Sequence, residues 1–290
     1  DRMIDKSVFL IIFVLFWWTS TLFLDTDFGW HLRLGEIILL QGIPKTDPLS
    51  YTMPSYPYVD HEWLTNVIFA KLYPLIGFAG LAFLFSLLAV LALALGITSF
   101  RKFVGIPLLL SAATILPFAG VRPQVITWFF LSLLLWILQT PGRLKRWYLV
   151  LPLLFLLWAN MHGGFAVGIV GFFVVVIVSF WKKYEFLTFR HSGLSRIRWG
   201  FWSLRQLADP QNDNQRLFLS FSICLLAAFI NPYGWRTWLR ILGEVWMQAS
   251  DSGLRWAIAE WLPAVFTINI GLILFLPLSV LLIWRYRKRF

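Results

Sequence analysis

The sequence predicts an all-α polytopic membrane protein with about eight transmembrane helices. Of its 290 residues 59% are apolar and only 13% are charged, and the mean hydropathy is +0.73. A soluble domain carries about 25% charged residues. The apolar residues also gather in runs near the roughly 20 residues that a helix needs to cross a bilayer. The runs cover residues 8–24, 74–100, 104–121, 123–140, 147–161, 163–181, 217–230 and 262–284.

The basic residues predict the orientation of the chain. With the N-terminus in the cytoplasm and alternating runs, 18 of the 25 basic residues fall on the cytoplasmic side. Short clusters of Lys and Arg between apolar runs are the topology signal of membrane proteins, so the net charge of +11 does not indicate nucleic acid as a partner. We therefore expect membrane lipids around the chain and both termini in the cytoplasm. Cys224 is the single cysteine and lies inside an apolar run, so it is expected to pack there.

The first apolar run predicts a retained helix, because no small-residue cleavage site follows it. The segment after it, residues 25–73, predicts a long first outer loop with two interfacial amphipathic helices. The first covers residues 28–40 and stops at Gly42, and the second starts near His61 and ends by Pro74. Proline-rich extended segments lie between them.

The whole chain, residues 1–290, is predicted to form one transmembrane domain. Residues 1–234 make its N-terminal module, and residues 182–216 form an inner basic loop that lies on headgroups and binds anionic lipid. Residues 235–261 form an outer interfacial segment rich in Trp, and residues 262–290 hold the last helix and a basic tail.

Polar side chains converge on the outer side in this topology, and we interpret them as one site. They are Asp25, Asp27, His31, His61, Glu62, Arg122, Gln124, Asn160, His162, Asn231 and Tyr233. Polar groups bordering a membrane cavity usually line a site. Each has a structural alternative: Asp25 and Asp27 would cap the next helix, and residues 231–234 would be a turn. Likewise Arg122 would snorkel to headgroups, and the histidines would be satisfied interfacial residues.

The Asp25-x-Asp27 pair allows two kinds of chemistry. It could hold a divalent cation such as Mg²⁺ or Mn²⁺ through oxygen ligands. Alternatively, one carboxylate could act as general base on an acceptor hydroxyl. Arg122, Arg33 or His162 would then face a phosphate leaving group. The sequence has no Gly-rich phosphate loop, so a soluble nucleotide-sugar site is not indicated.

These motifs resemble a family of bacterial polytopic membrane proteins that is similar to the GT-C superfamily of lipid-linked-sugar glycosyltransferases. That superfamily includes protein mannosyltransferases, the aminoarabinose transferase and oligosaccharyltransferases. The resemblance rests on Asp25-x-Asp27-x-Gly29-Trp30-His31-Leu32-Arg33-x-Gly35-Glu36, Pro44-x-x-Asp47-Pro48-x-Ser50-Tyr51-Thr52, His61-Glu62-Trp63-Leu64, Arg122-Pro123-Gln124, Asn160-Met161-His162-Gly163-Gly164, Asn231-Pro232-Tyr233-Gly234 and Glu260-Trp261.

The resemblance implies a bacterial inner-membrane enzyme that moves a sugar from a polyprenyl-phosphate lipid to an acceptor on the outer face. It implies an acidic catalytic motif just after the first transmembrane helix, where Asp25 and Asp27 lie, assisted by His61 and Glu62. In the same interpretation the phosphate is stabilised by Arg122 and His162, and the substrate is oriented by Asn160 and Asn231. GT-C enzymes usually continue for several more helices, often with a soluble outer domain that sets acceptor specificity.

Two other classes of function are compatible with the sequence. The first is a non-catalytic GT-C-like subunit, packed against other membrane subunits by its 17 Trp and 28 Phe. The second is a lipid or solute transporter, which would need ionisable residues at mid-depth. The apolar runs contain none, and outer carboxylates have no use in a pure scaffold, so the enzyme is the preferred interpretation.

Overall fold

The fold is all-helical throughout the part of the chain that the computed structural model describes, apart from one isolated antiparallel bridge between Thr46 and Pro57. The described residues are 6–97, 105–139, 148–192 and 213–250. The prediction of an all-α protein is confirmed. The predicted last helix and tail, residues 262–290, lie outside the described residues, as does most of the inner basic loop.

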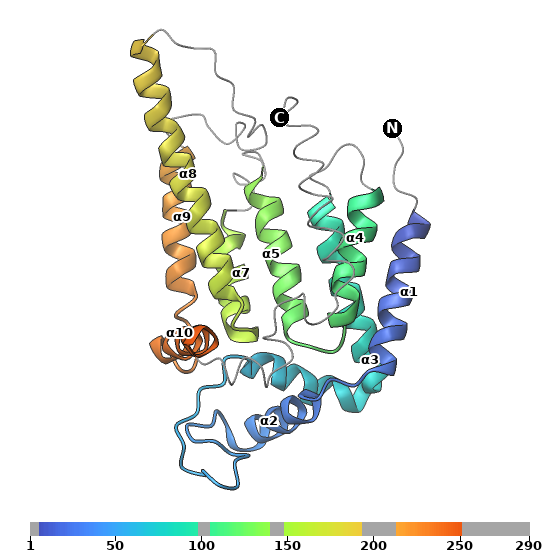
Figure 1. Cartoon of the computed structure of the whole chain (residues 1–290). Helices are drawn as coiled ribbons and strands as arrows, with labels where there is room; N and C mark the ends of the chain where they lie inside the picture. The colour runs from blue at the N-terminus through green and yellow to red at the C-terminus, as the bar shows by residue number, and fades with distance from the viewer. Residues whose placement is uncertain (1–5, 98–104, 140–147, 193–212, 251–290) are drawn as a thin grey trace.

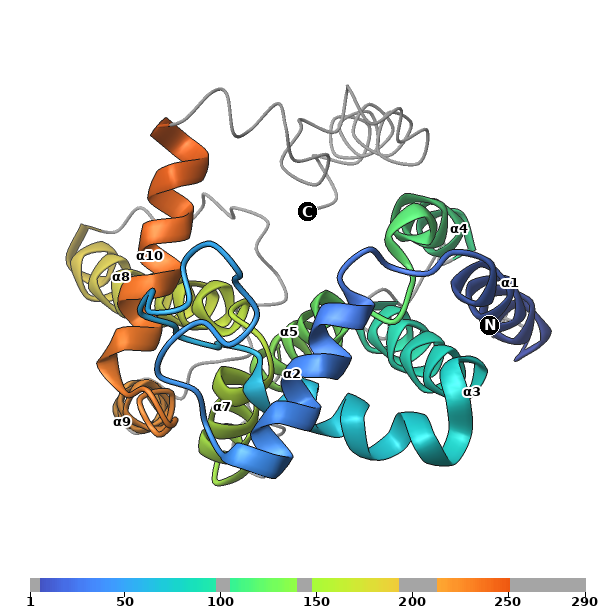
Figure 2. The same cartoon turned by 90° about the horizontal axis from the view of Figure 1, so that it is seen from below.

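Most helices stand side by side as an upright bundle (Figure 1). They are α1 (Lys6–Leu22), the second part of α3 (Trp63–Ile97), α4 (Gly105–Ile115) with the short η1 (Leu116–Phe118), α5 (Gln124–Leu138), α7 (Val150–Met161), α8 (Phe165–Ser192) and α9 (Asp213–Ala227). Across one end of the bundle lie α2 (Phe28–Gln41), the first part of α3, and α10 (Trp235–Ser250) (Figures 1 and 2). We call this the α2–α10 end.

The two expected interfacial helices of the first loop are present at this end, with one shifted boundary. Helix α2 ends at Gly42, whose φ of 86° suits glycine and whose amide donates to the Ile38 carbonyl. The second helix bends into the upright part of α3 at Gly77, where φ is 62°, rather than at Pro74. Proline removes one backbone donor, but the left-handed turn at a glycine reorients the axis.

Two hydrophobic clusters hold the bundle, and α5 belongs to both. One joins α1, α2, α3 and α4 to the start of α5, and the other joins α5 to α7, α8 and α9. Phe130 of α5 packs against both clusters. Close packing in the second cluster depends on Gly168, where a Cβ atom would lie 2.4 Å from the Trp158 ring.

The upright helices also expose large apolar side chains. Examples are Trp18 of α1, Leu153 of α7 and Leu226 of α9, with 64%, 53% and 67% of their surface accessible. In the described part of the chain, α3 is the one helix whose length and composition would cross a membrane, and the other apolar helices have 10–17 residues. The eight predicted spans therefore stay a prediction.

Candidate functional site

The exit of α1 and the start of α5 meet in an ion pair between Asp25 and Arg122. The Arg122 Nε atom contacts Oδ2 of Asp25, whose side chain is only 8% exposed. The other oxygen of Asp25 accepts the Asp27 amide at 2.9 Å. Asp27 is the N-terminal cap residue of α2, but its exposed carboxylate makes no capping hydrogen bond. The predicted capping role therefore accounts for neither side chain.

A buried chain of hydrogen bonds ties α2 to the start of α3. His31 Nδ1 lies 2.8 Å from Oδ1 of Asn66, and the Asn66 amide donates to Oδ2 of Asp60 at 2.8 Å. The other oxygen of Asp60 accepts the amide of Glu62 at 3.0 Å, so Asp60 caps the helix that follows. All four residues are buried. This chain fixes the backbone from which the Glu62 side chain projects.

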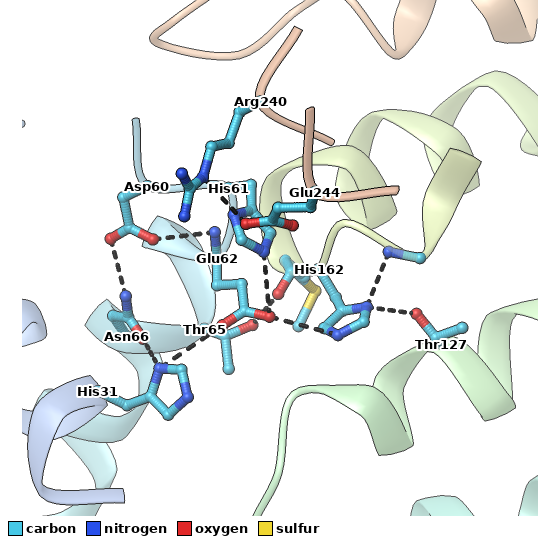
Figure 3. A network of polar contacts seen from close by, with 12 residues as sticks. His31, Asp60, His61, Glu62, Thr65, Asn66, Thr127, His162, Arg240 and Glu244 are labelled. Carbon is cyan, nitrogen blue, oxygen red and sulfur yellow. Dashed lines mark hydrogen bonds and ion pairs between the residues drawn. The ribbon is translucent and has the colours of Figure 1, made fainter. Parts of the chain in front are cut away.

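Glu62 lies at the centre of three histidines from three different elements (Figure 3). Its Oε1 atom is 3.3 Å from His162 Nε2 and 3.6 Å from His61 Nε2, and its Oε2 atom is 3.7 Å from His31 Nδ1. His31 comes from α2, His61 precedes Glu62 in the chain, and His162 caps the C-terminus of α7. The Glu62 carboxyl group therefore links α2, the start of α3 and the end of α7.

The electrostatic environment favours the neutral forms of these groups. Burial raises the pKa of Glu62 well above its usual range, and the carboxylates of Asp60 and Glu244 add to the shift. Burial also lowers the pKa of His61 to about 4, with the charge of Arg240 adding to it. The pKa of Asp60 is raised to about 6 by burial, although its hydrogen bonds act in the opposite direction.

Replacing His162 with Gln should remove a pH-dependent loss of stability. Burial, with the His61 and His31 rings adding to it, lowers the pKa of His162 from 6.5 to about 3. As the pH falls below about 6.5, a proton therefore binds the unfolded chain but not the folded protein. This difference should cost the wild type about 2 kcal/mol of unfolding free energy between about pH 7 and pH 5. Thermal unfolding of both proteins in detergent should show the difference, and parallel pH curves would contradict a neutral buried His162.

The α10 side of the cluster carries a charge pair. Arg240 Nε lies 2.9 Å from Oε1 of Glu244, one helical turn further on. Both side chains lie next to His61 and Glu62 in Figure 3. The charge of Arg240 contributes to the lowered pKa of His61, and that of Glu244 to the raised pKa of Glu62.

Three predicted substrate-binding residues instead connect parts of the backbone. Asn160 accepts Trp63 Nε1–H at 2.8 Å and donates to the carbonyls of Leu156 and Ile230. The Asn231 amide donates to the carbonyls of Ala228 and Gly234, and its oxygen accepts the Tyr233 amide and, at 2.7 Å, the Thr237 hydroxyl of α10, which is compatible with the turn alternative. Tyr233 donates its hydroxyl to the carbonyl of Pro44 at 2.9 Å, tying the start of α10 to the first loop.

Two other predicted residues divide between the surface and the interior. Arg33 is exposed and pairs with Glu36 at 2.8 Å on the outer side of α2, so the structure does not bring it to the cluster. Gln124 begins α5 close to Arg122 in the chain, and its Oε1 atom is buried without a hydrogen-bond partner among the described residues.

The structure adds site residues that the sequence analysis missed. They are Asp60, Asn66, Thr127, Arg240 and Glu244. Asp60 could have been found because it precedes His61 and Glu62, which makes three ionisable residues in a row before an apolar run. Asn66 follows Glu62 by one helical turn, a spacing that places both on one face. Thr127 carried no signal, because a lone Thr in an apolar helix is common.

No family model, curated protein or solved structure matches this chain. The resemblance to the GT-C superfamily therefore stays a proposal. That proposal rests on two groups of polar side chains, the Asp25–Arg122 pair with Asp27 and the Glu62 cluster.

Proposed function

We propose that this chain is a GT-C-like membrane glycosyltransferase that moves a sugar from a polyprenyl-phosphate donor to an acceptor at the outer face of the bacterial inner membrane. The Asp25–Arg122 pair is the observation that carries the proposal, because it sets a guanidinium and a carboxylate at one point where α1 ends and α5 begins. A lipid phosphate needs such a cation, and a hydroxyl nucleophile needs a carboxylate nearby.

The surfaces of the helices support a membrane setting. Apolar side chains that face outward on the upright helices suit a lipid environment, where only helices and closed barrels satisfy their backbones. Helix α10 exposes Trp235, Leu239 and Trp246, which suits the headgroup level. We propose about eight spans, with α2 and the first part of α3 as interfacial helices of the first outer loop.

In the proposed reaction Arg122 and the carboxylates have different roles. An acceptor oxygen bonds to the anomeric carbon while the bond from that carbon to the phosphate oxygen breaks, and the electron pair stays on the phosphate. Arg122 stabilises the negative charge that develops there. The acceptor proton passes to one of the carboxylates, Asp25, Asp27 or Glu62.

The proposal does not require a divalent cation. Oxygen Oδ2 of Asp25 already contacts Arg122 and Oδ1 accepts an amide, so Asp25 offers a cation little free charge. Among the described residues no group of three or more His, Cys, Asp or Glu could hold a metal ion. A chelator arm in the assay tests whether a divalent cation at Asp25 and Asp27 is needed.

The test is binding of a short-chain polyprenyl phosphate, together with release of polyprenyl phosphate from sugar-bearing forms. A charge-neutral double variant, Asp25→Asn with Arg122→Gln, removes the pair without leaving either charge alone. We expect it to lose binding by about tenfold or more. Asp27→Asn should leave binding intact, since the Asp27 side chain makes no contact with the Asp25–Arg122 pair.

Two matched variants serve as controls. Arg33→Gln and Glu36→Gln remove an exposed ion pair of α2 that lies outside the cluster, so both should behave as wild type. Saturable binding that depends on Arg122 but not on Arg33 would support the enzyme. Failure of the well-folded wild type to bind any polyprenyl phosphate would exclude it.

A non-catalytic subunit is the second candidate, and one observation favours it. The polar atoms of Asn160, Asn231 and Tyr233 are used within the chain, which is what a scaffold requires. The same binding experiment separates the two functions, because a subunit would bind no donor lipid and would instead co-purify with other membrane proteins.

A further inference from the structure

The His162 ring is held so that one particular nitrogen faces Glu62. Its Nδ1 atom lies 2.8 Å from the amide nitrogen of Gly164, a group that can only donate. Nδ1 is therefore the accepting, unprotonated nitrogen, and the neutral ring carries its hydrogen on Nε2. That Nε2 atom lies 3.3 Å from Oε1 of Glu62. The hydrogen bonds thus point an N–H group at the carboxyl.

Thr127 strengthens this arrangement from α5. Its hydroxyl accepts Trp158 Nε1–H at 2.9 Å, so its own hydrogen is left for His162 Nδ1 at 2.8 Å. Trp158 is fully buried, which anchors the series of bonds in the core. Protonation at Nδ1 would break both bonds that the nitrogen accepts, so Thr127 and Gly164 stabilise the neutral ring.

The backbone at residues 163 and 164 is shaped for these contacts. A Cβ atom at Gly164 would lie 2.2 Å from the Thr127 hydroxyl and 2.8 Å from His162 Nδ1. One at Gly163 would lie 2.9 Å from the His61 ring. The absence of a side chain at both glycines therefore leaves room for His61 and His162 to reach Glu62.

The hydrogen bonds of His162 place a hydrogen, not a metal ion, on the Nε2 atom that faces Glu62. A metal on His162 Nε2 would need that nitrogen unprotonated, whereas the donors at Nδ1 place the hydrogen on Nε2. A structural carboxylate would also be expected to pair with a basic side chain, but Arg240 is bound to Glu244. Glu62 instead has three imidazole rings around it.

We propose that Glu62 is the general base of the transfer reaction, that His162 donates its Nε2–H to the Glu62 carboxylate, and that Thr127 is a positioning residue for His162. This inference rests on the proposed glycosyl transfer. The Glu62 carboxylate takes the hydrogen of the acceptor hydroxyl as the new carbon–oxygen bond forms, and it ends as a neutral carboxylic acid. The phosphate leaves with the electron pair of the broken bond.

The surroundings of Glu62 make it a stronger base than an exposed carboxylate. Charged and titratable groups face it from each element packed around it: His31 of α2, Asp25 and Asp27 before α2, Asp60 and His61 beside it, His162 after α7, and Arg240 and Glu244 of α10. Burial and the nearby carboxylates raise its pKa, which brings it closer to the operating pH of a base. The His162 N–H points at Oε1 of Glu62, and a donor in that place favours the charged form of the carboxylate.

The experiment compares Glu62→Gln, Thr127→Val and Thr127→Ser with wild type in lipid nanodiscs. The probes are polyprenyl phosphate for binding, and release of that lipid from short-chain polyprenyl-phosphate sugars with a bacterial envelope extract as acceptor. ¹⁵N-labelled histidine reports the tautomer and pKa of His162, assigned through His162→Gln. This spectroscopic measurement does not depend on turnover.

We expect Glu62→Gln to bind polyprenyl phosphate as wild type does and to release it about 100-fold or more slowly. His162 should appear as the Nε2–H tautomer, and Thr127→Val should raise its pKa by about one unit and slow release. Thr127→Ser keeps the hydroxyl and should restore both properties, which a purely structural role of Thr127 would not predict.

Wild-type release rates in Glu62→Gln, or an Nδ1–H tautomer of His162, would overturn this inference. If Asp27→Asn stops release while Glu62→Gln does not, the base is Asp27 and the proposed function stands. If the folded wild type neither binds nor releases polyprenyl phosphate, both the base and the function are wrong. If Glu62→Gln fails to fold, the inference is tested by the tautomer of His162 and by the comparison of Thr127→Val with Thr127→Ser.

Discussion

Replacing Gly35 with Ala is expected to cost about 3 kcal/mol of stability and to displace α2 from the bundle. A Cβ atom there would lie 1.9 Å from the carbonyl oxygen of Asn66 and 2.5 Å from its carbonyl carbon. Backbone atoms inside α3 cannot rotate away as a flexible side chain would, so the two helices must separate. Because His31 lies one turn before Gly35, its 2.8 Å contact with Asn66 should be lost with them.

Gly29→Ala provides the matched control for this prediction. Gly29 lies on the same helix, and nothing comes within 4 Å of the position that its Cβ atom would occupy. Alanine is the better helix former by about 1 kcal/mol, so Gly29→Ala should be neutral or slightly stabilising. Thermal unfolding in detergent, followed by tryptophan fluorescence, measures both variants. Equal stability of the two would mean that α2 does not pack on α3 at Asn66.

The sequence predicted the elements of this fold better than their bends. The apolar runs predicted the described upright helices, because these helices carry apolar side chains both in the core and on their exposed sides. The amphipathic pattern found α2, and Gly42 marked its end. The bend in α3 was expected at Pro74 because proline is the stronger local signal. It occurs at Gly77, because a positive φ depends on tertiary packing that a sequence pattern does not reveal.

The sequence predicted which side of the protein the polar residues share, but residue type alone did not predict the partner of each one. Topology placed His31, Glu62 and His162 on one side, and the structure brings them together. Asn160 and Asn231 were expected to face a substrate. An amide serves equally well to hold backbone carbonyls, and both amides are used in that way. Sequence patterns show that a polar group is present, but not which partner satisfies it.

Removing Arg122 alone is expected to destabilise the protein by about 3 kcal/mol, whereas removing Asp25 with it should not. In Arg122→Met the Asp25 carboxylate, with 8% of its side chain exposed, loses its ion pair in a poorly solvated position. The double variant Arg122→Met with Asp25→Asn removes both charges, and the Asn oxygen can still accept the Asp27 amide. A double-mutant cycle of unfolding free energies measures the coupling, and additive effects would contradict a tight pair.

The same pair predicts an opposite effect on binding when Asp25 alone is changed. Arg122 is held by Asp25, so a phosphate must compete with that carboxylate for the guanidinium. Asp25→Asn should therefore bind polyprenyl phosphate several-fold more tightly than wild type, while Arg122→Met binds it more weakly. Weaker binding in Asp25→Asn would instead mean that the carboxylate positions Arg122 for the phosphate. Tighter binding in Asp25→Asn would mean that the Asp25 carboxylate pairs with the Arg122 guanidinium only until the donor binds, and that the phosphate then displaces this carboxylate.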